Sequence, residues 1–571
     1  MKVTPTQGST LQLLDREQLR IARSAFRAGG DLSQVTMVLG MACEDDLLEA
    51  VGATLRLDVI ELRETEIDAA LLEGFPPRVI HRGRVFPIAR RREGLTVVVA
   101  NPFDLESLDT LAGIAGERIL PVLARPRDVA ILIKKYLGVG AETVDGMLAQ
   151  RSDDATALAA DGDLSDADAA DLAQQASVVR LVNEILTEAV ESRASDVHLE
   201  SYASGMQIRY RIDGVLHRQS VPPEIHHFRA AIISRLKIMS QLNIAERRVP
   251  QDGRINLQIS GREIDMRISI IPMLHGEGIV MRVLDKDRSD FSLKGLGMDP
   301  GTHEQLGKLI TLPHGIILVT GPTGSGKTTT LYSALNEIKS DETKIVTTED
   351  PVEYQLEGIQ QIQVHSKVGL TFATSLRSIL RHDPDVVLVG EIRDLETAEN
   401  AIQAALTGHL VFSTLHTNDS AGAFMRLIDM GVEPFLVSST VEGVMAQRLV
   451  RKLCRECRTS IRPQPDELPE DFPFEQLIAR GGKIFTTAGC PVCRGTGYRG
   501  RGGLYELLVI NEEVRALAGQ RASSVDIRRA AIRGGLKTLR DDGWQQVLAG
   551  ATTVEEVMRV TRAEVCEVPQ S

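Results

Sequence analysis

Residues 321–328 carry the plainest chemical signal in this sequence. They read GPTGSGKT and fit the phosphate-loop pattern G-x-x-x-x-G-K-[ST], between an apolar run at 316–320 and a helical pattern at 328–338. Glycines let backbone N–H groups curl around phosphate oxygens, and the helix points its positive end at them. Lys327 should reach the β- and γ-phosphates, and Thr328 should ligate Mg²⁺. The pattern predicts a site for ATP and magnesium, formed by Gly321, Pro322, Thr323, Gly324, Ser325, Gly326, Lys327, Thr328 and Thr329.

One apolar run ends in a carboxylate that could act on the magnesium ion. Residues 386–391 read VVLVGE, the pattern of a buried strand that ends in an acid, as a Walker B strand does. Gly390 occupies the place where an Asp is common, so Thr328 would hold the ion and Glu391 would act on it through water. An ordinary surface acid at a strand end is the alternative for Glu391.

A second apolar run delivers acids to the same kind of position. Residues 345–353 read IVTTEDPVE, so that Glu349 ends the predicted strand and Asp350 and Glu353 follow it. Ligands of α/β sheets bind at the carboxyl ends of the strands. We therefore expect Glu349 and Glu391 to be catalytic and to position the attacking water, although the acids of this run could also be surface groups.

Two histidines flank a third apolar run, residues 410–415. A histidine at the end of a buried strand can sense the γ-phosphate or orient neighbouring acids, although a lone histidine is more often structural. Because two acidic strand ends are predicted beside this strand, we expect both His409 and His416 to take part in the reaction.

Four of the six cysteines form two Cys-x-x-Cys pairs, and thirty-two residues separate the pairs. In a reducing compartment such pairs are typical metal ligands, and four thiolates suit a closed tetrahedral zinc site. Reduced free thiols are the alternative. Residues 461–483 between the pairs are rich in proline and acids, which argues against a zinc ribbon that binds nucleic acid. The predicted ligands are Cys454, Cys457, Cys490 and Cys493.

These groups need domains to hold them, and 571 residues suggest three or four. Strand and helix patterns alternate over residues 291–571, as in a wound α/β sheet, with the tetracysteine segment at 452–500 inside. Residues 177–290 predict an α+β domain that begins with a helix and continues with strands.

The N-terminal part has two patterns of its own. Residues 1–75 show the apolar spacing of helices, and residues 76–140 that of an α+β module. In this module we expect strands at 79–88 and 95–99 and helices at 105–115 and 126–137.

Residues 141–176 differ from both neighbours, because they carry nine acidic residues and one basic residue. So little apolar surface cannot offset the entropy of ordering, which predicts a flexible linker or a transient helix.

Overall composition limits the function classes. The formal net charge is −13 and aromatic residues make up 4% of the chain, which disfavours a motor that grips nucleic acid. No apolar run approaches the length of a bilayer span, and the N-terminus lacks the apolar core of a signal peptide. We therefore expect a cytoplasmic protein whose membrane contacts come through partners.

Together these motifs resemble one family. The phosphate loop, both acidic runs and the run flanked by histidines look like the Walker A, Asp box, Walker B and His box of the secretion ATPase superfamily, and two further segments extend the match. The segments are GPTGSGKTTTLY at 321–332, TTEDPVEY at 347–354, LRHDPDVVLVGEIRDLETAE at 380–399, TGHLVFSTLHTND at 407–419, RVPQDGRI at 248–255 and AQRLVRKLC at 446–454. Within that superfamily the chain resembles the type II secretion assembly ATPases, the GspE/PulE family, in the spacing of its cysteine pairs and in residues 432–451.

The resemblance implies a RecA-like motor domain over 291–571, a preceding PAS-like domain over 177–290, and a homohexamer with ATP sites between subunits. It implies that Glu349 activates water, that Glu391 acts on magnesium, and that Arg267 and Arg282 reach a nucleotide as arginine fingers. The alternative for each arginine is an ion pair with a nearby acid, such as Asp265 or Glu277. The N-terminal module would dock on inner-membrane platform proteins, a GspL-like cytoplasmic domain and a GspF-like protein. The chain would then be peripheral on the cytoplasmic face of that membrane.

Some relatives bind cyclic di-GMP through an N-terminal Arg-Leu-Gly-rich motif, which is not found at residues 9–60. Three other functions remain open: a type IV pilus extension ATPase with the same chemistry, a nucleic-acid motor on the same core, and a scaffold that binds ATP without hydrolysis. The acidic charge argues against the second, and intact Lys327, Glu349 and Glu391 argue against the third.

Overall fold

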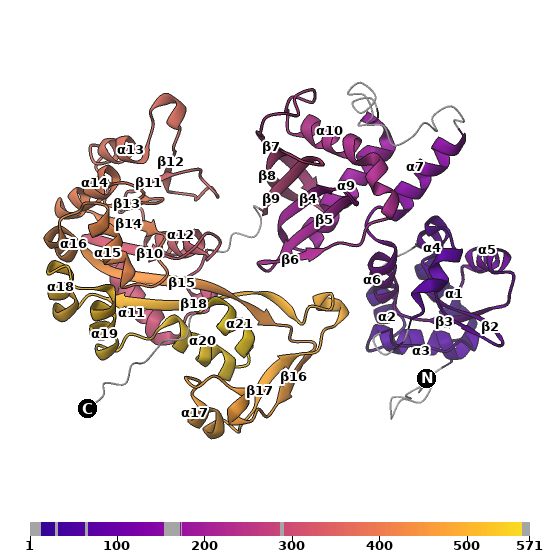
Figure 1. Cartoon of the computed structure of the whole chain (residues 1–571). Helices are drawn as coiled ribbons and strands as arrows, with labels where there is room; N and C mark the ends of the chain where they lie inside the picture. The colour runs from indigo at the N-terminus through magenta and orange to yellow at the C-terminus, as the bar shows by residue number, and fades with distance from the viewer. Residues whose placement is uncertain are drawn as a thin grey trace. The chain divides into compact units, whose positions relative to one another are not determined.

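The computed structural model of the chain describes residues 13–28, 32–62, 65, 67–153, 172, 174–285 and 291–561. The chain divides into two compact units, Met1–Asp287 and Arg288–Ser571. In Figure 1 the first unit runs from indigo to magenta and the second from pink through orange to yellow. Each unit is described by itself.

The C-terminal unit is built on a sheet of seven strands. Its strand order is β12-β11-β13-β14-β10-β15-β18, and every neighbouring pair is parallel except β15 and β18. The strands are β10 (Gly315–Thr320), β11 (Ile345–Glu349), β12 (Gln360–Gln363), β13 (Val386–Val389), β14 (Leu410–Leu415), β15 (Val441–Leu453) and β18 (Tyr498–Val509).

Helices cover both faces of this sheet. Ile316 and Leu318 of β10 enter one hydrophobic core, whereas Ile317 and Val319 enter another. Strands buried on both faces read as continuous apolar runs, which is why these runs were visible in the sequence. The helices are α11 (Pro300–Ile310), α12 (Lys327–Ile338), α13 (Phe372–Ile379), α14 (Leu395–Leu406), α15 (Gly422–Asp429), α16 (Pro434–Thr440), α18 (Glu512–Gly519), α19 (Ser524–Arg533), α20 (Leu539–Leu548) and α21 (Val554–Val560).

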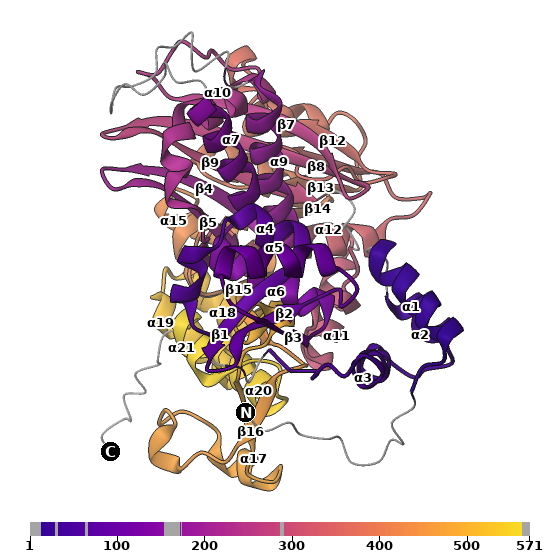
Figure 2. The same ribbon diagram turned by 90° about the vertical axis from the view of Figure 1, so that its right-hand side faces the viewer.

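The cysteine segment lies apart from the sheet. The ends of β15 and β18 lead into it, and it contains a two-stranded hairpin and a short helix. Figures 1 and 2 both show these elements below the large sheet. They are β16 (Arg458–Ile461), α17 (Phe474–Ala479) and β17 (Ile484–Thr487).

The second half of the N-terminal unit is an antiparallel sheet of six strands, in the order β6-β5-β4-β9-β8-β7. Alternate residues of β5 and β8 are buried against helices, and the other face is polar. Its elements are α9 (Ala176–Glu191), β4 (Ala194–Tyr202), β5 (Gly205–Ile212), β6 (Val215–Arg218), α10 (Arg229–Met239), β7 (Gln251–Ile259), β8 (Arg262–Met273) and β9 (Gly276–Asp285).

The first half contains helices around a three-stranded sheet in the order β1-β2-β3. The predicted strand at 79–88 was wrong in its first half, because Pro77 starts a helix that ends at Arg84 with a φ of 46°. The elements are α1 (Arg16–Ala28), α2 (Leu32–Val38), α3 (Glu44–Leu55), α4 (Pro77–Gly83), β1 (Val85–Arg91), β2 (Gly94–Val99), α5 (Leu105–Ala115), β3 (Ile119–Leu123) and α6 (Pro126–Leu137).

The prediction of a flexible linker over 141–176 was wrong at its start. Helix α7 occupies Ala141–Asp153, and Val144 and Met147 are buried in the same core as α9. Thr143 also donates a hydrogen bond to Glu184, at 2.9 Å. The prediction considered only the number of acids and overlooked apolar residues at helical spacing, Val144 and Met147. Their burial stabilises the helix. Residues 154–171 lie outside the described residues.

The predicted fold class is confirmed: an α/β unit follows an α+β domain and an N-terminal helical and α+β module. Among the described helices, none is both long and apolar enough to cross a bilayer.

One buried acid gives the C-terminal unit a pH-dependent stability. Burial raises the pKa of Asp542 to about 6, while the N–H of Tyr505, 3.0 Å away, opposes the shift. A carboxyl whose pKa is raised on folding stabilises the fold below its unfolded value, and this stability is lost as the pH rises through about 6. Asp542→Asn should therefore increase the free energy of unfolding at pH 8 by about 1–3 kcal/mol.

The asparagine keeps a side-chain carbonyl oxygen that can accept from the N–H of Tyr505. The increase in the free energy of unfolding should become smaller as the pH falls from 6 towards 4. Thermal unfolding of the variant and the wild type across this range measures the effect. A difference that stays constant from pH 4 to pH 8 would contradict it.

Candidate active site

The phosphate loop joins the end of β10 to the start of α12 and packs tightly on β15. A Cβ on Gly321, whose φ is +148°, would lie 2.6 Å from the carbonyl oxygen of Gln447 and 3.0 Å from Arg448 Nη1. At Gly326, with a φ of +93°, it would lie 2.8 Å from the Gln447 amide nitrogen. Both positions therefore require glycine for packing as well as for conformation.

The loop already holds a cation and an unused donor. The Lys327 ammonium donates to the carbonyl oxygens of Gly321 and Pro322, at 2.7 and 3.1 Å. Burial lowers its pKa, and the charge of Arg448 lowers it further against the opposite effect of Glu391. The Ser325 hydroxyl is buried and has no hydrogen-bond partner in the described chain. An anion with several oxygens fits this cradle.

Glu391 lies directly beside the loop. Its carboxylate is 15% exposed and pairs with Arg393, and it lies 3.3 Å from His416 Nε2. The charge of Glu391 raises the pKa of Lys327 against the effect of burial. Glu391 follows β13, which ends at the same edge of the sheet as β10 and the loop. Of the two predicted histidines, His416 is thus the one in contact with a predicted catalytic acid.

Glu349 stands in a different environment, because it ends β11 with only 5% exposure. The Thr347 hydroxyl and the Gln361 amide donate to Oε1, at 2.6 and 3.1 Å, and the Tyr332 hydroxyl donates to Oε2. Both oxygens therefore have donors from the protein. Asp350, the next residue, is exposed.

The predicted catalytic role of His409 was wrong. β14 runs parallel to β10, with Gly315 opposite Leu410 and Thr320 opposite Leu415. His409 therefore lies at the amino edge of the sheet, about 17 Å of strand away from the phosphate loop. Its Nδ1 contacts the carbonyl oxygen of Ala404 at 2.9 Å, a structural contact at the end of α14.

Arg448 is a residue of this site that sequence reasoning missed. It lies on β15, donates from Nη1 to the Gln447 carbonyl oxygen at 2.9 Å, and donates from Nη2 to Asn418 O and Oδ1 at 3.0 and 3.1 Å. Burial lowers its pKa. The segment AQRLVRKLC contains it, but nothing in that pattern indicates phosphate; only the pairing of β15 with β10 brings the two together.

The predicted arginine fingers lie in the N-terminal unit, on the polar face of its six-stranded sheet. Strand register places Arg254, Arg267 and Arg282 directly opposite one another on β7, β8 and β9, about 4.8 Å from strand to strand. Asp196 comes next in the row, and its Oδ1 lies 3.4 Å from Arg282 Nε. Like charges at successive register positions repel each other, so this row favours an anion.

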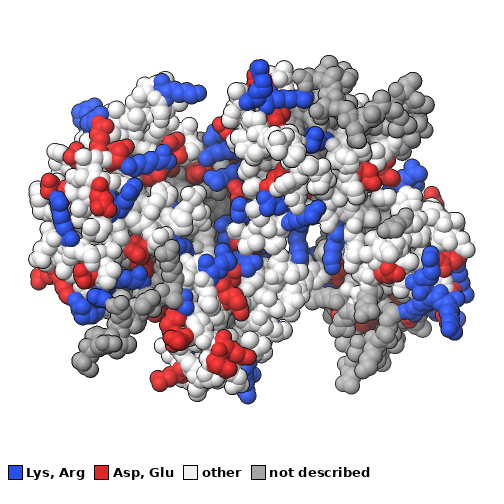
Figure 3. Space-filling view, viewed as in Figure 1, with Lys and Arg blue, Asp and Glu red and all other residues white. Residues whose placement is uncertain are grey.

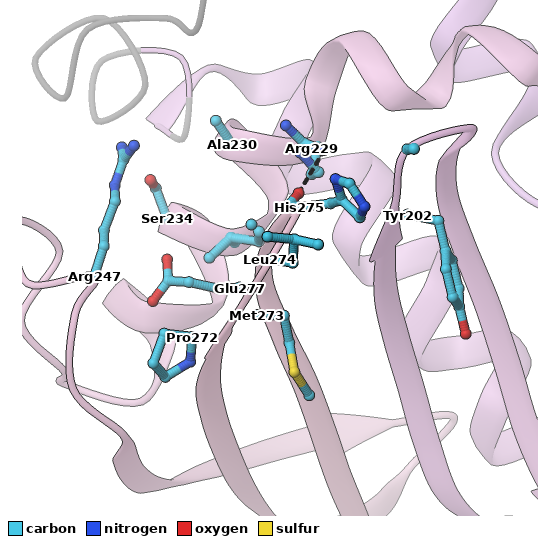
Figure 4. A pocket seen from close by; sticks show the side chains of 13 residues that line it. Tyr202, Arg229, Ala230, Ser234, Arg247, Pro272, Met273, Leu274, His275 and Glu277 are labelled. Carbon is cyan, nitrogen blue, oxygen red and sulfur yellow. Dashed lines mark hydrogen bonds between the residues drawn. The ribbon is translucent and has the colours of Figure 1, made fainter.

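A hollow of about 420 Å³ opens elsewhere in the same unit (Figure 4). The hairpin tip between β8 and β9 forms one wall, and Arg229 of α10 donates to the carbonyl oxygen of His275 there, at 3.0 Å. Nearby, the buried Lys237 pairs with Glu277 and donates to the Glu246 carbonyl oxygen, both at 2.7 Å. These bonds fix the loop that leads into β7, and the hollow contains none of the predicted site residues.

The four predicted zinc ligands meet at one point, and their sulfur atoms all lie within 4.8 Å of one another. The Sγ atoms of Cys454 and Cys490 are 3.8 Å apart, and so are those of Cys457 and Cys493. The N–H groups of Cys490 and Gly497 point at Cys493 Sγ, at 3.1 and 3.2 Å, as donors to a thiolate do. This donor set suits a tetrahedral zinc ion.

The loop, its lysine and the strand-end acid Glu391 at one edge of a parallel sheet define a P-loop nucleotide hydrolase. A family model described as Type II/IV secretion system protein matches residues 171–559, and one described as MshEN domain matches residues 55–143. The chain belongs to the Type II/IV secretion system protein family and is a secretion ATPase with a RecA-like motor unit.

Three relatives show how close the similarity is. The chain is 43% identical over 566 residues to Type II secretion system protein E of Xanthomonas campestris pv. campestris, with 96% of each chain covered. It is 53% identical over 404 residues to Type II secretion system protein E of Pectobacterium carotovorum subsp. carotovorum, covering 70% of this chain and 78% of that one. It is 38% identical over 557 residues to Type IV pilus assembly ATPase PilB of Myxococcus xanthus, with 96% of each covered.

Proposed function

We propose that this chain is the ATP-hydrolysing motor that powers pseudopilus assembly and protein export through a type II secretion system. The observation that carries the proposal is the 43% identity to a type II secretion protein E over 96% of both chains. On the face of the C-terminal unit that Figure 3 shows, acidic and basic side chains are interspersed and do not form the basic stripe typical of nucleic-acid binding.

The described groups divide the reaction among them. Lys327 and Arg448 neutralise the phosphate charge, and the N–H groups of the loop orient it. Thr328, with Glu391 through water, would hold magnesium, which supplies further charge neutralisation when bound. Glu349 accepts the proton of the attacking water, whose oxygen bonds to the γ-phosphorus as the bond to the ADP oxygen breaks. His416 keeps Glu391 in orientation.

Lys327→Ala should abolish ATP hydrolysis and, in a strain that carries only this variant, stop the export of secreted proteins while pili still form. The lysine is the cation of the loop, and its loss leaves the γ-phosphate charge uncovered. Glu391→Gln should keep ATP binding but lower turnover by about 10²-fold or more.

Lys308→Ala is the matched control, because Lys308 is an exposed helix residue that pairs with Glu304. Phosphate release and culture supernatants are the measurements. Loss of pili with normal export would instead support the second candidate, a type IV pilus extension ATPase, which the 38% identity to PilB favours.

We propose that the arginine row adds a further cation, beside Lys327 and Arg448, for the charge that develops on the γ-phosphate. We place Arg267 and Arg282 at the nucleotide of a neighbouring subunit in a homohexamer, where such a finger is worth about 10³-fold or more. The family and the alignment of the arginines on one open sheet face support this assignment.

A mixing experiment tests the shared site. Arg267→Ala and Lys327→Ala should each be nearly inactive alone. Co-assembled in equal amounts they should recover activity, because about one interface in four then pairs an intact Lys327 with an intact Arg267 of the next chain. No recovery in hexamers shown to be mixed would mean that Arg267 does not act in trans.

The cysteine cluster should hold about one structural Zn²⁺ per chain. Elemental analysis of the purified protein measures the metal, and Cys457→Ser should lower both the zinc content and the melting temperature. Cys43→Ser, at an exposed cysteine outside the cluster, should change neither. A metal content near zero with four titratable thiols in the native protein would remove the assignment.

We place the chain on the cytoplasmic face of the inner membrane, held by a GspL-like cytoplasmic domain and a GspF-like protein. The N-terminal module, which includes the MshEN match at 55–143, is the part assigned to docking. Support comes from the family and from the identity to type II secretion system protein E.

A further inference from the structure

The acid assigned to the attacking water is held in place by a tyrosine of the phosphate-loop helix. Tyr332 lies on α12, five residues after Lys327, and its hydroxyl donates to Glu349 Oε2. A buried carboxylate with no donor would be strongly destabilising, so this contact shapes how Glu349 can lie. Tyr332 is the last residue of the segment GPTGSGKTTTLY, but nothing in that pattern indicates a contact with Glu349.

The position of Tyr332 does not depend on the hydrogen bond. Its ring is fully buried and meets Phe291 edge to face, with centroids 5.2 Å apart and an interplanar angle of 78°. Phe291 makes a second edge contact with Tyr354, at 5.4 Å. The aromatic cluster therefore fixes the ring, and the ring presents the hydroxyl to Glu349.

The hydroxyl stays a donor over the whole working range of pH. Burial raises the pKa of Tyr332, and the negative charge of Glu349 raises it further. The tyrosine therefore remains neutral and keeps its proton, while the carboxylate accepts.

The other donors tie the following loop to the same carboxylate. Gln361 of β12 donates to Glu349 Oε1 at 3.1 Å and to the carbonyl oxygen of Tyr354 at 3.0 Å. The side-chain oxygen Oε1 of Gln361 accepts from the backbone N–H of Leu356 at 2.8 Å. The helix that begins at the phosphate loop, the acid and the loop behind it are thus joined through one carboxylate.

We propose that Tyr332 is a positioning residue for the reaction: its hydroxyl holds the Glu349 carboxylate in the orientation from which it acts on the attacking water. Tyr332 touches no substrate and acts only through Glu349. The proposal rests on the role proposed above for Glu349. Because α12 carries both Lys327 and Tyr332, the group that contacts the phosphates and the group that orients the acid move as one rigid element.

Tyr332→Phe tests this in the full-length hexameric protein, because it removes one oxygen and leaves the ring in its packing. We expect kcat for ATP hydrolysis to fall about tenfold or more, with KM and nucleotide affinity within about twofold. A melting temperature close to that of the wild type shows that the fold is kept. Tyr354→Phe is the matched control: it removes a hydroxyl from the same aromatic cluster, leaves the donors to Glu349 in place, and should keep kcat.

Thr347→Val removes a different donor to the same carboxylate and should also lower kcat more than it changes KM. An unchanged kcat in Tyr332→Phe overturns the proposal. So does a change that appears mainly as a higher KM, or a fall in kcat of the same size in Tyr354→Phe. Glu349→Gln distinguishes failure of the role proposed for Glu349 from failure of the role proposed for Tyr332. If Glu349→Gln hydrolyses ATP at the wild-type rate, the role of Glu349 is wrong, and a lower kcat in Tyr332→Phe cannot then arise through Glu349.

Discussion

The parallel pairing of β11, β13, β14 and β10 is the constraint on which the rest of the C-terminal unit depends. Strands that run in the same direction and lie in register end at one edge. Thr348 is opposite Val389, Val389 is opposite Ser413, and Thr320 is opposite Leu415. Segments far apart in the chain therefore deliver the phosphate loop, Glu391 and His416 to a common place.

Two acids at this edge have different surroundings, and this difference supports the different roles that we propose for them. Glu391 is bracketed by Arg393 and His416 beside the loop, where its charge influences Lys327. Glu349 is almost fully buried and receives protein donors on both oxygens. A carboxylate surrounded by fixed donors has a defined orientation, whereas one among charged side chains can exchange partners when a ligand arrives.

The site is also more cationic than the phosphate-loop pattern indicates. Arg448 reaches the loop from β15, and burial disfavours the charged form of both Arg448 and Lys327. An anion that binds between them replaces the interactions with water that both side chains lost on burial. Nucleotide binding is therefore linked to the packing of the loop on β15. The arginine row of the other unit adds a second surface with the same preference, built by register on an antiparallel sheet.

The sequence by itself determined the groups that are local: the glycine loop and its lysine, the acids that end apolar runs, the two cysteine pairs and the alternation that defines the fold class. Each of these is a short pattern whose chemistry and neighbouring element lie within a few residues. Only the tertiary structure decided which end of β14 faces the phosphates, and it placed His416 in the site and His409 outside it. It also brought Arg448 and Tyr332 to the site, because strand pairing and helix packing, not spacing along the chain, set those distances. The helix at Ala141–Asp153 was not predicted for a related reason. Its stability comes from burial against α9, and a count of acidic residues gives no information about that burial.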